Sequence, residues 1–356
     1  VRHTDTLALT ESNGTKTDHL ALGSDLTRTA GLNFSTLALD ASSGAVTLDL
    51  GGYAFQTDNS ALGRGILVNG SNPVTIRGGA HGAQSATYLH NYGTGKFTWA
   101  LTNNSSCTLV STGPGLTEIT QSVLNTLIIS EGVTRLTMAR AFAEGIIYVF
   151  GDGVLEIGAD LNGAGTAGDF SRSAGSGAGQ IYFVAGGGFS AYGADRTVNL
   201  GGAGGAVGWL QPEGKPLVLS SSHANATLIL VNPISLSSYQ REIRVRNGSA
   251  PIDARLTGKI YGIGPASLFK SGDGTLELTG KQDYFGDFSV IGGGLRLGAD
   301  DVFAGGTNAL ALSNATLDAG TGRNAFDTLE LLSDSVIAAG NGSASLSFSD
   351  SSAKTW

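Results

Sequence analysis

Short alternations of apolar and polar residues recur along the whole chain, and each run ends in Gly, Asn, Asp or Ser. Examples are STLALD at 35–40, AVTLDLGG at 45–52, NTLIISEG at 125–132 and GTLELTG at 274–280. Strict alternation places the two sets of side chains on opposite faces of a half-buried strand. The runs return about every 8–12 residues, a spacing that is typical of an all-β protein.

The same pattern continues through all 356 residues without a change in composition. A sandwich of this length would be several domains joined by linkers, but the seven prolines form no linker-like cluster. Such uniformity favours a solenoid, in which each turn contacts its neighbours. We therefore expect a single continuous parallel β-helix (β-solenoid) over residues 1–356, with about 20–25 residues in each of about 14–18 coils. The abrupt start at Val1 and stop at Trp356 suggest a fragment of a longer chain.

Two segments interrupt this rhythm. The segment GAGTAGDFSRSAGSGAG at 163–179 is small, polar and unpatterned, and we expect a Gly/Ser-rich loop that is extruded from the coils. The segment TRLTMARAFAEGI at 134–146 tolerates either a short lateral helix or a further coil, and the residues do not decide between them.

Composition explains how the corners of such coils are made and narrows the choice of partners. Glycine supplies 55 residues, about twice its usual share, and it reaches the positive φ angles that tight corners need. Charged residues make up only 14% of the chain, and the net charge is −8, so nucleic acid is not an expected partner.

No apolar run reaches about 18 residues, so no membrane span is expected. Cys107 is the single cysteine, which excludes an internal disulfide, and we expect it to be a small buried residue.

Carboxylates are the first candidates for chemistry, because β-helix proteins include polysaccharide lyases and hydrolases. Such enzymes need Asp or Glu side chains stacked on one face, to bind calcium or to act as acid and base. Asp300 and Asp301 are adjacent, so within a strand they would point to opposite faces, and we interpret both as turn caps. For Asp152, Glu156 and Asp160 we expect a corner, a solvent-facing and a corner position.

Histidines and aromatic residues are the remaining candidates. No histidine lies in an HExxH or HxH pattern, and His81, in a glycine-rich turn, is expected to face solvent. The stretch YLHNYGTGKFTW at 88–99 contains Tyr88, Tyr92, Phe97 and Trp99, which could form a sugar-binding face or pack inside a coil. The sequence therefore predicts no catalytic, cofactor-binding or metal-binding residue. The histidines of the chain are His3, His19, His81, His90 and His223.

Residues 271–301, SGDGTLELTGKQDYFGDFSVIGGGLRLGADD, resemble the autotransporter-associated β-strand repeat, also called the passenger-associated transport repeat. That pattern runs as a G-x-GTL-x-L-x-G strand, a turn with Tyr and Gly, and a close of the form G-x-L-x-L-G. The chain departs from it at Lys281-Gln282-Asp283, where the family favours a triplet that contains Asn. The resemblance implies a right-handed parallel β-helix that is exported by a Gram-negative-type cell. The matching residues are Gly272, Gly274, Thr275, Leu276, Leu278, Gly280, Tyr284, Gly286, Gly294, Leu295, Leu297 and Gly298.

From the pattern and the resemblance together we expect a non-catalytic structural or adhesive passenger or stalk segment of an exported bacterial surface protein. The repeat would assist secretion and folding, and the location would be the cell surface or the extracellular space. Expected partners are neighbouring segments of the same long chain and surface glycans or host or biofilm components. Two alternatives stay open: a carbohydrate-active β-helix enzyme of the lyase or hydrolase type, and a glycan-binding module without catalysis.

Overall fold

The computed structural model describes residues 7–10, 19–57, 65–82, 86–103, 107–121, 125–138, 145–162, 168–340, 342 and 344–354. These residues form strands, turns and bends, and none of them lies in a helix. Accordingly, the described part of the chain offers no helix with the length and apolarity to cross a membrane.

The chain divides into two compact units. The N-terminal unit comprises Val1–Leu155, Ala159–Gly163 and Gly175–Tyr182. The C-terminal unit comprises Glu156–Gly158, Ala164–Ala174 and Phe183–Trp356, so the boundary falls within strand β17 (Val154–Ile157). Each unit stacks its own coils; that both belong to one continuous solenoid stays a prediction.

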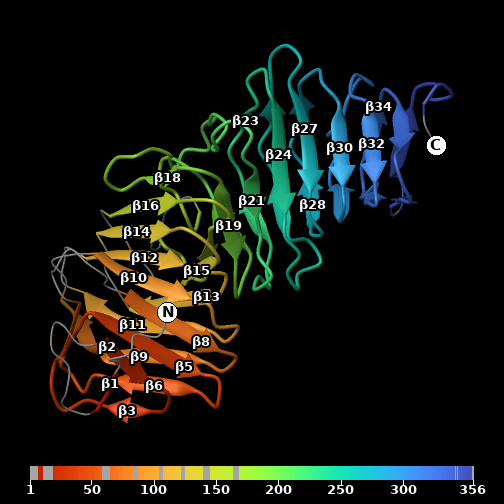
Figure 1. The fold of residues 1–356 in the computed structure, drawn as a ribbon. Helices are drawn as coiled ribbons and strands as arrows, with labels where there is room; N and C mark the ends of the chain where they lie inside the picture. The colour runs from red at the N-terminus through yellow and green to blue at the C-terminus, as the bar shows by residue number, and fades with distance from the viewer. Residues whose placement is uncertain are drawn as a thin grey trace. The chain divides into compact units, whose positions relative to one another are not determined.

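Two parallel sheets make up most of the N-terminal unit, and Figure 1 shows the strands of the first sheet stacked one above another. The first sheet has the order β1 (Leu7–Ala8), β2 (His19–Leu22), β5 (Thr36–Ala41), β8 (Gly65–Gly70), β10 (Ala86–Asn91), β12 (Thr108–Thr112), β14 (Thr126–Ile129), β16 (Ile146–Val149) and β18 (Ile181–Phe183). The second contains β3 (Leu26–Thr27), β6 (Val46–Asp49), β9 (Val74–His81), β11 (Phe97–Asn103), β13 (Leu116–Gln121) and β15 (Val133–Leu136), with β4 (Leu32–Phe34) and β7 (Ala54–Thr57) beside them.

The core of this unit is built from rows of side chains that point inward from successive coils. One row is Leu20, Leu37, Ile66, Leu89, Ser111, Ile129 and Val149, and each of these residues is buried. Alternate residues of the same strands are more exposed, as the alternating sequence predicts for strands with one buried face. The parallel pairing of residues that are one coil apart is the arrangement of a parallel β-helix, which confirms the predicted all-β class.

The C-terminal unit stacks coils in the same way, and its strands β24, β27, β30 and β32 lie side by side as parallel arrows in Figure 1. One sheet includes β19 (Gly187–Ala191), β21 (Leu217–Leu219), β24 (Gln240–Val245), β27 (Ser267–Ser271), β30 (Phe288–Ile291), β32 (Leu310–Ser313) and β35 (Leu329–Leu331). A seven-stranded sheet has the order β20 (Arg196–Val198), β22 (Leu228–Leu230), β25 (Ala254–Leu256), β28 (Thr275–Leu278), β31 (Gly294–Leu297), β33 (Thr316–Asp318) and β36 (Val336–Ala338). Two small sheets complete the unit: β23 (Ile234–Ser235), β26 (Ile260–Tyr261) and β29 (Gln282–Asp283), and β34 (Arg323–Phe326) with β37 (Ser345–Phe348).

The segment 271–301 folds into parts of two successive coils of this unit. Leu276 pairs with Leu295 and Leu278 with Leu297, and all four leucines are fully buried. The chain turns after the preceding strand at Gly272, whose φ of 80° is a left-handed value that glycine adopts without a steric penalty. The glycines and leucines of the segment therefore have the corner and core roles that the sequence predicts.

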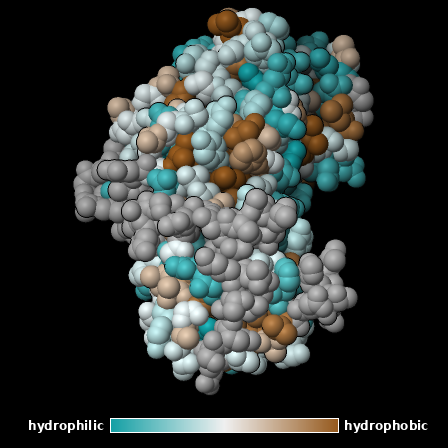
Figure 2. All heavy atoms as spheres, turned by 60° about the vertical axis from the view of Figure 1, so that its left-hand side comes forward, coloured by the Kyte–Doolittle hydropathy of each residue, from teal (hydrophilic) through white to brown (hydrophobic). Residues whose placement is uncertain are grey.

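Aromatic side chains also stack inside the C-terminal unit. Phe288, Phe303, Phe326 and Phe348 follow one another with ring centroids 5.3, 4.5 and 5.6 Å apart. Such pairs add to the free energy of unfolding beyond the area that they bury. On the molecular face drawn in Figure 2, in contrast, apolar residues form separate small groups between hydrophilic ones.

The expected interruptions are partly visible. Residues 168–179 contain no strand, and residues 163–167 of the predicted loop 163–179 lie outside the described part. Phe170 is buried, forms a bridge with Val198 and packs on Phe189, which anchors residues 168–174 to the C-terminal unit. Within 134–146, residues up to Leu136 belong to β15, as a further coil requires, and residues 139–144 lie outside the described part. The step between paired residues is 18 residues from Thr108 to Thr126 but 30 from Gly187 to Leu217, so coil length varies more than we expected.

Candidate functional site

The adjacent carboxylates Asp300 and Asp301 hold a corner of the C-terminal unit. An Oδ1 atom of Asp300 accepts a hydrogen bond of 2.7 Å from the backbone N–H of Arg323, one coil further on. Asp301 has a φ of 54°, and its own N–H donates to the carbonyl oxygen of Arg323. The predicted capping role is therefore confirmed for Asp300.

The evenly spaced carboxylates Asp152, Glu156 and Asp160 have different surroundings. Asp152 lies exposed in a turn, and Asp160 accepts a hydrogen bond from the N–H of Asn162, as corner residues do. Glu156 is completely buried, so the expected solvent-facing position was wrong. Its Oε1 atom accepts hydrogen bonds from the hydroxyls of Ser190 (2.9 Å) and Ser221 (2.6 Å), which replace water around the carboxylate.

His81 is also buried, which corrects the expectation that it faces solvent. Its ring lies 5.9 Å from the ring of Phe55 and 5.1 Å from that of Trp99, and its Nε2 atom is 2.9 Å from the Thr87 hydroxyl. Cys107 is buried as predicted, and its Sγ atom donates to the carbonyl oxygen of His81. The described residues hold no group of three or more His, Cys, Asp or Glu side chains that could bind a metal ion. His3 lies outside the described residues.

The four aromatic residues of 88–99 separate into two pairs. Phe97 and Trp99 are fully buried in the N-terminal core, whereas Tyr88 and Tyr92 are 44% and 56% exposed. Trp99 makes an edge contact with Phe55 at 5.7 Å, which is a packing role. The four residues therefore do not form one sugar-binding face.

Tyr88 instead belongs to a row of outward side chains on the first sheet of the N-terminal unit. It pairs with Val110, which pairs with Ile128, which pairs with Tyr148. The ring of Tyr148 then meets that of Tyr182 at 6.3 Å and an interplanar angle of 81°. We call these five residues, Tyr88, Val110, Ile128, Tyr148 and Tyr182, the tyrosine stripe.

The surroundings of the tyrosine stripe are uncharged. The adjacent outward positions on one side are Ala86, Thr108, Thr126 and Ile146, and those on the other side are His90, Thr112, Ser130 and Phe150, none of which is Asp, Glu, Lys or Arg. This surface is difficult to predict from the sequence, because IIYVF at 146–150 and IYF at 181–183 are apolar at inward and outward positions alike. A strand with no polar alternation does not reveal which of its residues face outward.

A second candidate is a groove of about 540 Å³ on the C-terminal unit. It lies over the outer face of the sheet that contains β28, β31 and β33, and Asp273, Arg296 and Asp318 are among its lining residues. Arg296 is paired along this face with Glu277 at 3.4 Å and with Asp318 at 3.7 Å. Asp318 also accepts a hydrogen bond from the N–H of Gly320, so its carboxylate has a structural role already.

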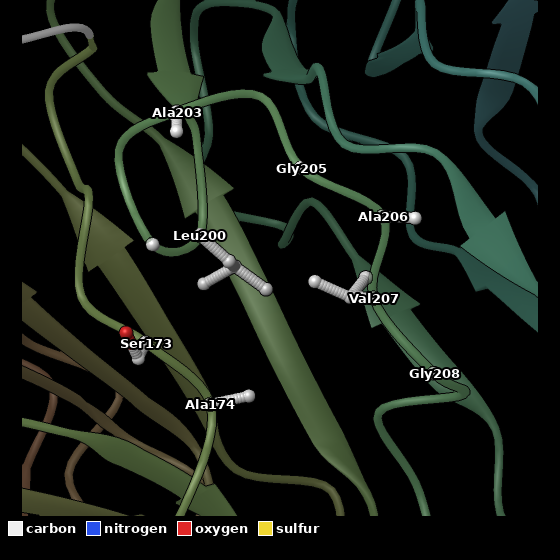
Figure 3. A pocket seen from close by; sticks show the side chains of 9 residues that line it. Ser173, Ala174, Leu200, Ala203, Gly205, Ala206, Val207 and Gly208 are labelled. Carbon is white, nitrogen blue, oxygen red and sulfur yellow. The ribbon is translucent and has the colours of Figure 1, made fainter.

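A third hollow, of about 390 Å³, is drawn in Figure 3. The side chains of Leu200 and Val207 point toward one another across it, and most of the remaining lining consists of Gly and Ala. Ser173 supplies the single side-chain hydroxyl of the lining. This hollow has no titratable group with which to perform chemistry.

Comparisons of the chain with protein-family models, with curated proteins and with solved structures find no match. The resemblance of residues 271–301 to a repeat family stays a prediction. A function for the chain therefore has to be argued from the side chains that the two units present.

Proposed function

We propose that this chain is a non-catalytic structural and adhesive segment of an exported bacterial surface protein, a passenger or stalk made of stacked coils. The observation that carries the proposal is the tyrosine stripe, an uncharged row of side chains on successive coils in which Tyr88 and Tyr182 are exposed, Ile128 and Tyr148 are half-buried and Val110 is buried. Coil stacking gives a rigid support, and contiguous apolar surface on a soluble protein commonly marks an interaction site.

The roles of the buried carboxylates support the non-catalytic part of the proposal. Glu156 accepts two serine hydroxyls, and Asp253 accepts the N–H groups of Gly248 (2.6 Å) and Thr275 (2.8 Å). Both carboxylates are thus engaged by hydrogen-bond donors of the protein itself, Glu156 by side-chain hydroxyls and Asp253 by backbone N–H groups, which is a structural role.

The segment 271–301 supports the exported part of the proposal. Its resemblance is to a repeat of secreted passengers, and its glycines and leucines occupy the corners and the core of stacked coils. Within such a protein the repeat would assist secretion and folding at the cell surface. Partners would be neighbouring segments of the same long chain and components of surfaces or biofilms.

The test has a catalytic arm and an adhesive arm. The chain is incubated with neutral polysaccharides and, in the presence of calcium, with polygalacturonate, and new reducing ends and unsaturated products are measured. We expect no product, together with retention of the fluorescently labelled chain on biofilm matrix. Calcium-dependent cleavage of the polyuronate, or the absence of any retention, would overturn the proposal.

The groove on the C-terminal unit favours one second candidate, a carbohydrate-active enzyme. Its lining combines the carboxylates Asp273 and Asp318 with the guanidinium of Arg296. If cleavage occurs, this candidate predicts that Asp318→Asn abolishes it, whereas Asp300→Asn, at a corner outside the groove, does not.

A further inference from the structure

We propose that the tyrosine stripe binds a neutral polysaccharide whose chain runs along the direction in which the coils stack. This inference rests on the proposed adhesive function and specifies its ligand. It concerns the N-terminal unit alone, because all five stripe residues belong to that unit.

The stripe is long enough to contact several sugar rings in succession. Neighbouring parallel strands lie about 4.8 Å apart, so its five positions extend over about 19 Å. Tyr88 and Tyr182, at the two ends, are 44% and 42% exposed, and Ile128 and Tyr148 are half-buried. Val110 is only 8% exposed, so the sugar contacts are made by Tyr88 at one end and by Ile128, Tyr148 and Tyr182 at the other. The edge-on contact between Tyr148 and Tyr182 fixes the relative orientation of the two rings.

The side chains of the stripe can contact both the apolar faces and the hydroxyl-bearing edge of a sugar ring. A pyranose ring has C–H groups on its faces and hydroxyl groups at its edge, and a tyrosine side chain has an apolar ring with a polar tip. Within the described part of the chain, the hydroxyls of Tyr88, Tyr148 and Tyr182 have no hydrogen-bond partner, so they can donate to and accept from sugar hydroxyls. Thr108, Thr126 and Ser130 place further hydroxyls beside the row.

The absence of charge selects a neutral ligand. The outward positions of β8, β10, β12, β14 and β16 carry no Asp, Glu, Lys or Arg. Recognition of a uronate or of a phosphate would need a cation at the surface, since Arg and Lys form the strong charge-assisted hydrogen bonds to such anions. A polyuronate or a nucleic acid would therefore gain no charge-assisted hydrogen bond from this face.

The experiment measures retention of the full chain in affinity gels that contain hydroxyethyl cellulose, xyloglucan or polygalacturonate. We expect retention by at least one neutral polymer and none by polygalacturonate. The double substitution Tyr148→Ala/Tyr182→Ala should weaken binding at least tenfold, whereas Tyr148→Phe/Tyr182→Phe, which keeps both rings, should lose only a few fold. Tyr53→Ala is the matched control, because Tyr53 is a 44% exposed tyrosine of the same unit outside the stripe.

Thermal unfolding of each variant shows whether it has folded, and sedimentation velocity shows whether the stripe joins two copies. Equal binding by the alanine variant and the wild type, preference for polygalacturonate, or a dimer that dissociates on the double alanine substitution would each overturn the inference. Retention on biofilm without binding to any neutral polymer would overturn this inference while the proposed adhesive function stands. Cleavage of a polysaccharide would instead overturn the proposed function.

Discussion

The Nζ atom of Lys270 donates a hydrogen bond of 2.7 Å to the carbonyl oxygen of Gly292, which lies one coil further along the chain. The same ammonium group donates to the carbonyl oxygen of Gly272 at 2.6 Å, so it joins two successive glycine corners from inside the C-terminal unit. Lys270 is fully buried at an inward position between Ile243 and Val290. A lysine at a core position is thus explained by two carbonyl groups that need donors.

Burial lowers the pKa of Lys270 to about 8, and the nearby carboxylates Asp273 and Asp253 offset part of this effect. Between about pH 8 and the ordinary value of about 10.4 the unfolded chain holds more protons than the folded chain, so the free energy of unfolding rises with pH. We expect a rise of at most about 3 kcal/mol in this window. Urea unfolding at pH 8 and pH 10 measures it, and Lys270→Met should remove it. A wild-type chain that loses stability between these pH values would contradict the prediction.

Tyr284 offers a test of a buried hydroxyl. The residue is only 3% exposed, and its hydroxyl has no hydrogen-bond partner among the described residues. An unsatisfied buried polar group costs about 1–3 kcal/mol, so Tyr284→Phe should raise the free energy of unfolding by about 1 kcal/mol. Burial also raises the pKa of Tyr284, and the stability that depends on its neutral form is lost above about pH 10. The phenylalanine variant should lack this alkaline loss, and a variant that is less stable than the wild type at pH 7 would contradict the prediction.

Gly188 marks a place where two strands approach closely. A Cβ atom at this position would lie 1.7 Å from the carbonyl oxygen of Val218, in the adjacent coil. Gly188→Ala should therefore lower the free energy of unfolding by about 1–3 kcal/mol through backbone displacement. Gly205→Ala is the control in the same unit, because a Cβ atom there meets nothing within 4 Å. Equal denaturation midpoints for the two variants would contradict the prediction, because they would mean that the two strands can move apart without a loss in the free energy of unfolding.

Strand β36 exposes a side chain at a position that the preceding strand of its sheet, β33, buries. Ile337 pairs with Leu317, yet it is 41% exposed whereas Leu317 is fully buried. Unpaired strand edges with apolar side chains promote association between chains. We expect Ile337→Lys to reduce self-association in sedimentation velocity at high concentration. Phe285→Lys, at a 74% exposed apolar residue elsewhere in the unit, should have a smaller effect.

The sequence was sufficient to predict strands and their stacking, because alternation appears directly in segments such as Thr36–Ala41 and Thr275–Leu278. It failed at His81, and the reason is local. The expectation placed His81 in a glycine-rich turn, but β9 continues through Gly78 and Gly79 to His81, and the register shift in its pairing with β11 between Ala100 and Thr102 accompanies the inward position of His81.

Glu156 and the tyrosine stripe could not have been predicted, for two other reasons. The hydroxyls that bind Glu156 come from Ser190 and Ser221, 34 and 65 residues away, and no local pattern signals partners at such distances. Tyr148 and Tyr182 lie in apolar runs, and their alignment depends on coil lengths that the sequence does not state.

The number of residues between paired positions differs from coil to coil, and this has a consequence for which insertions and deletions the chain can tolerate. Lengthening a corner loop costs little in closure entropy, and the strands on either side keep their partners. The chain can therefore gain or lose residues at its corners, as between Gly187 and Leu217, without disturbing the alignment of its faces. In an architecture of this kind, loops of new length and sequence can be inserted at the corners while the stacked strands keep their pairing.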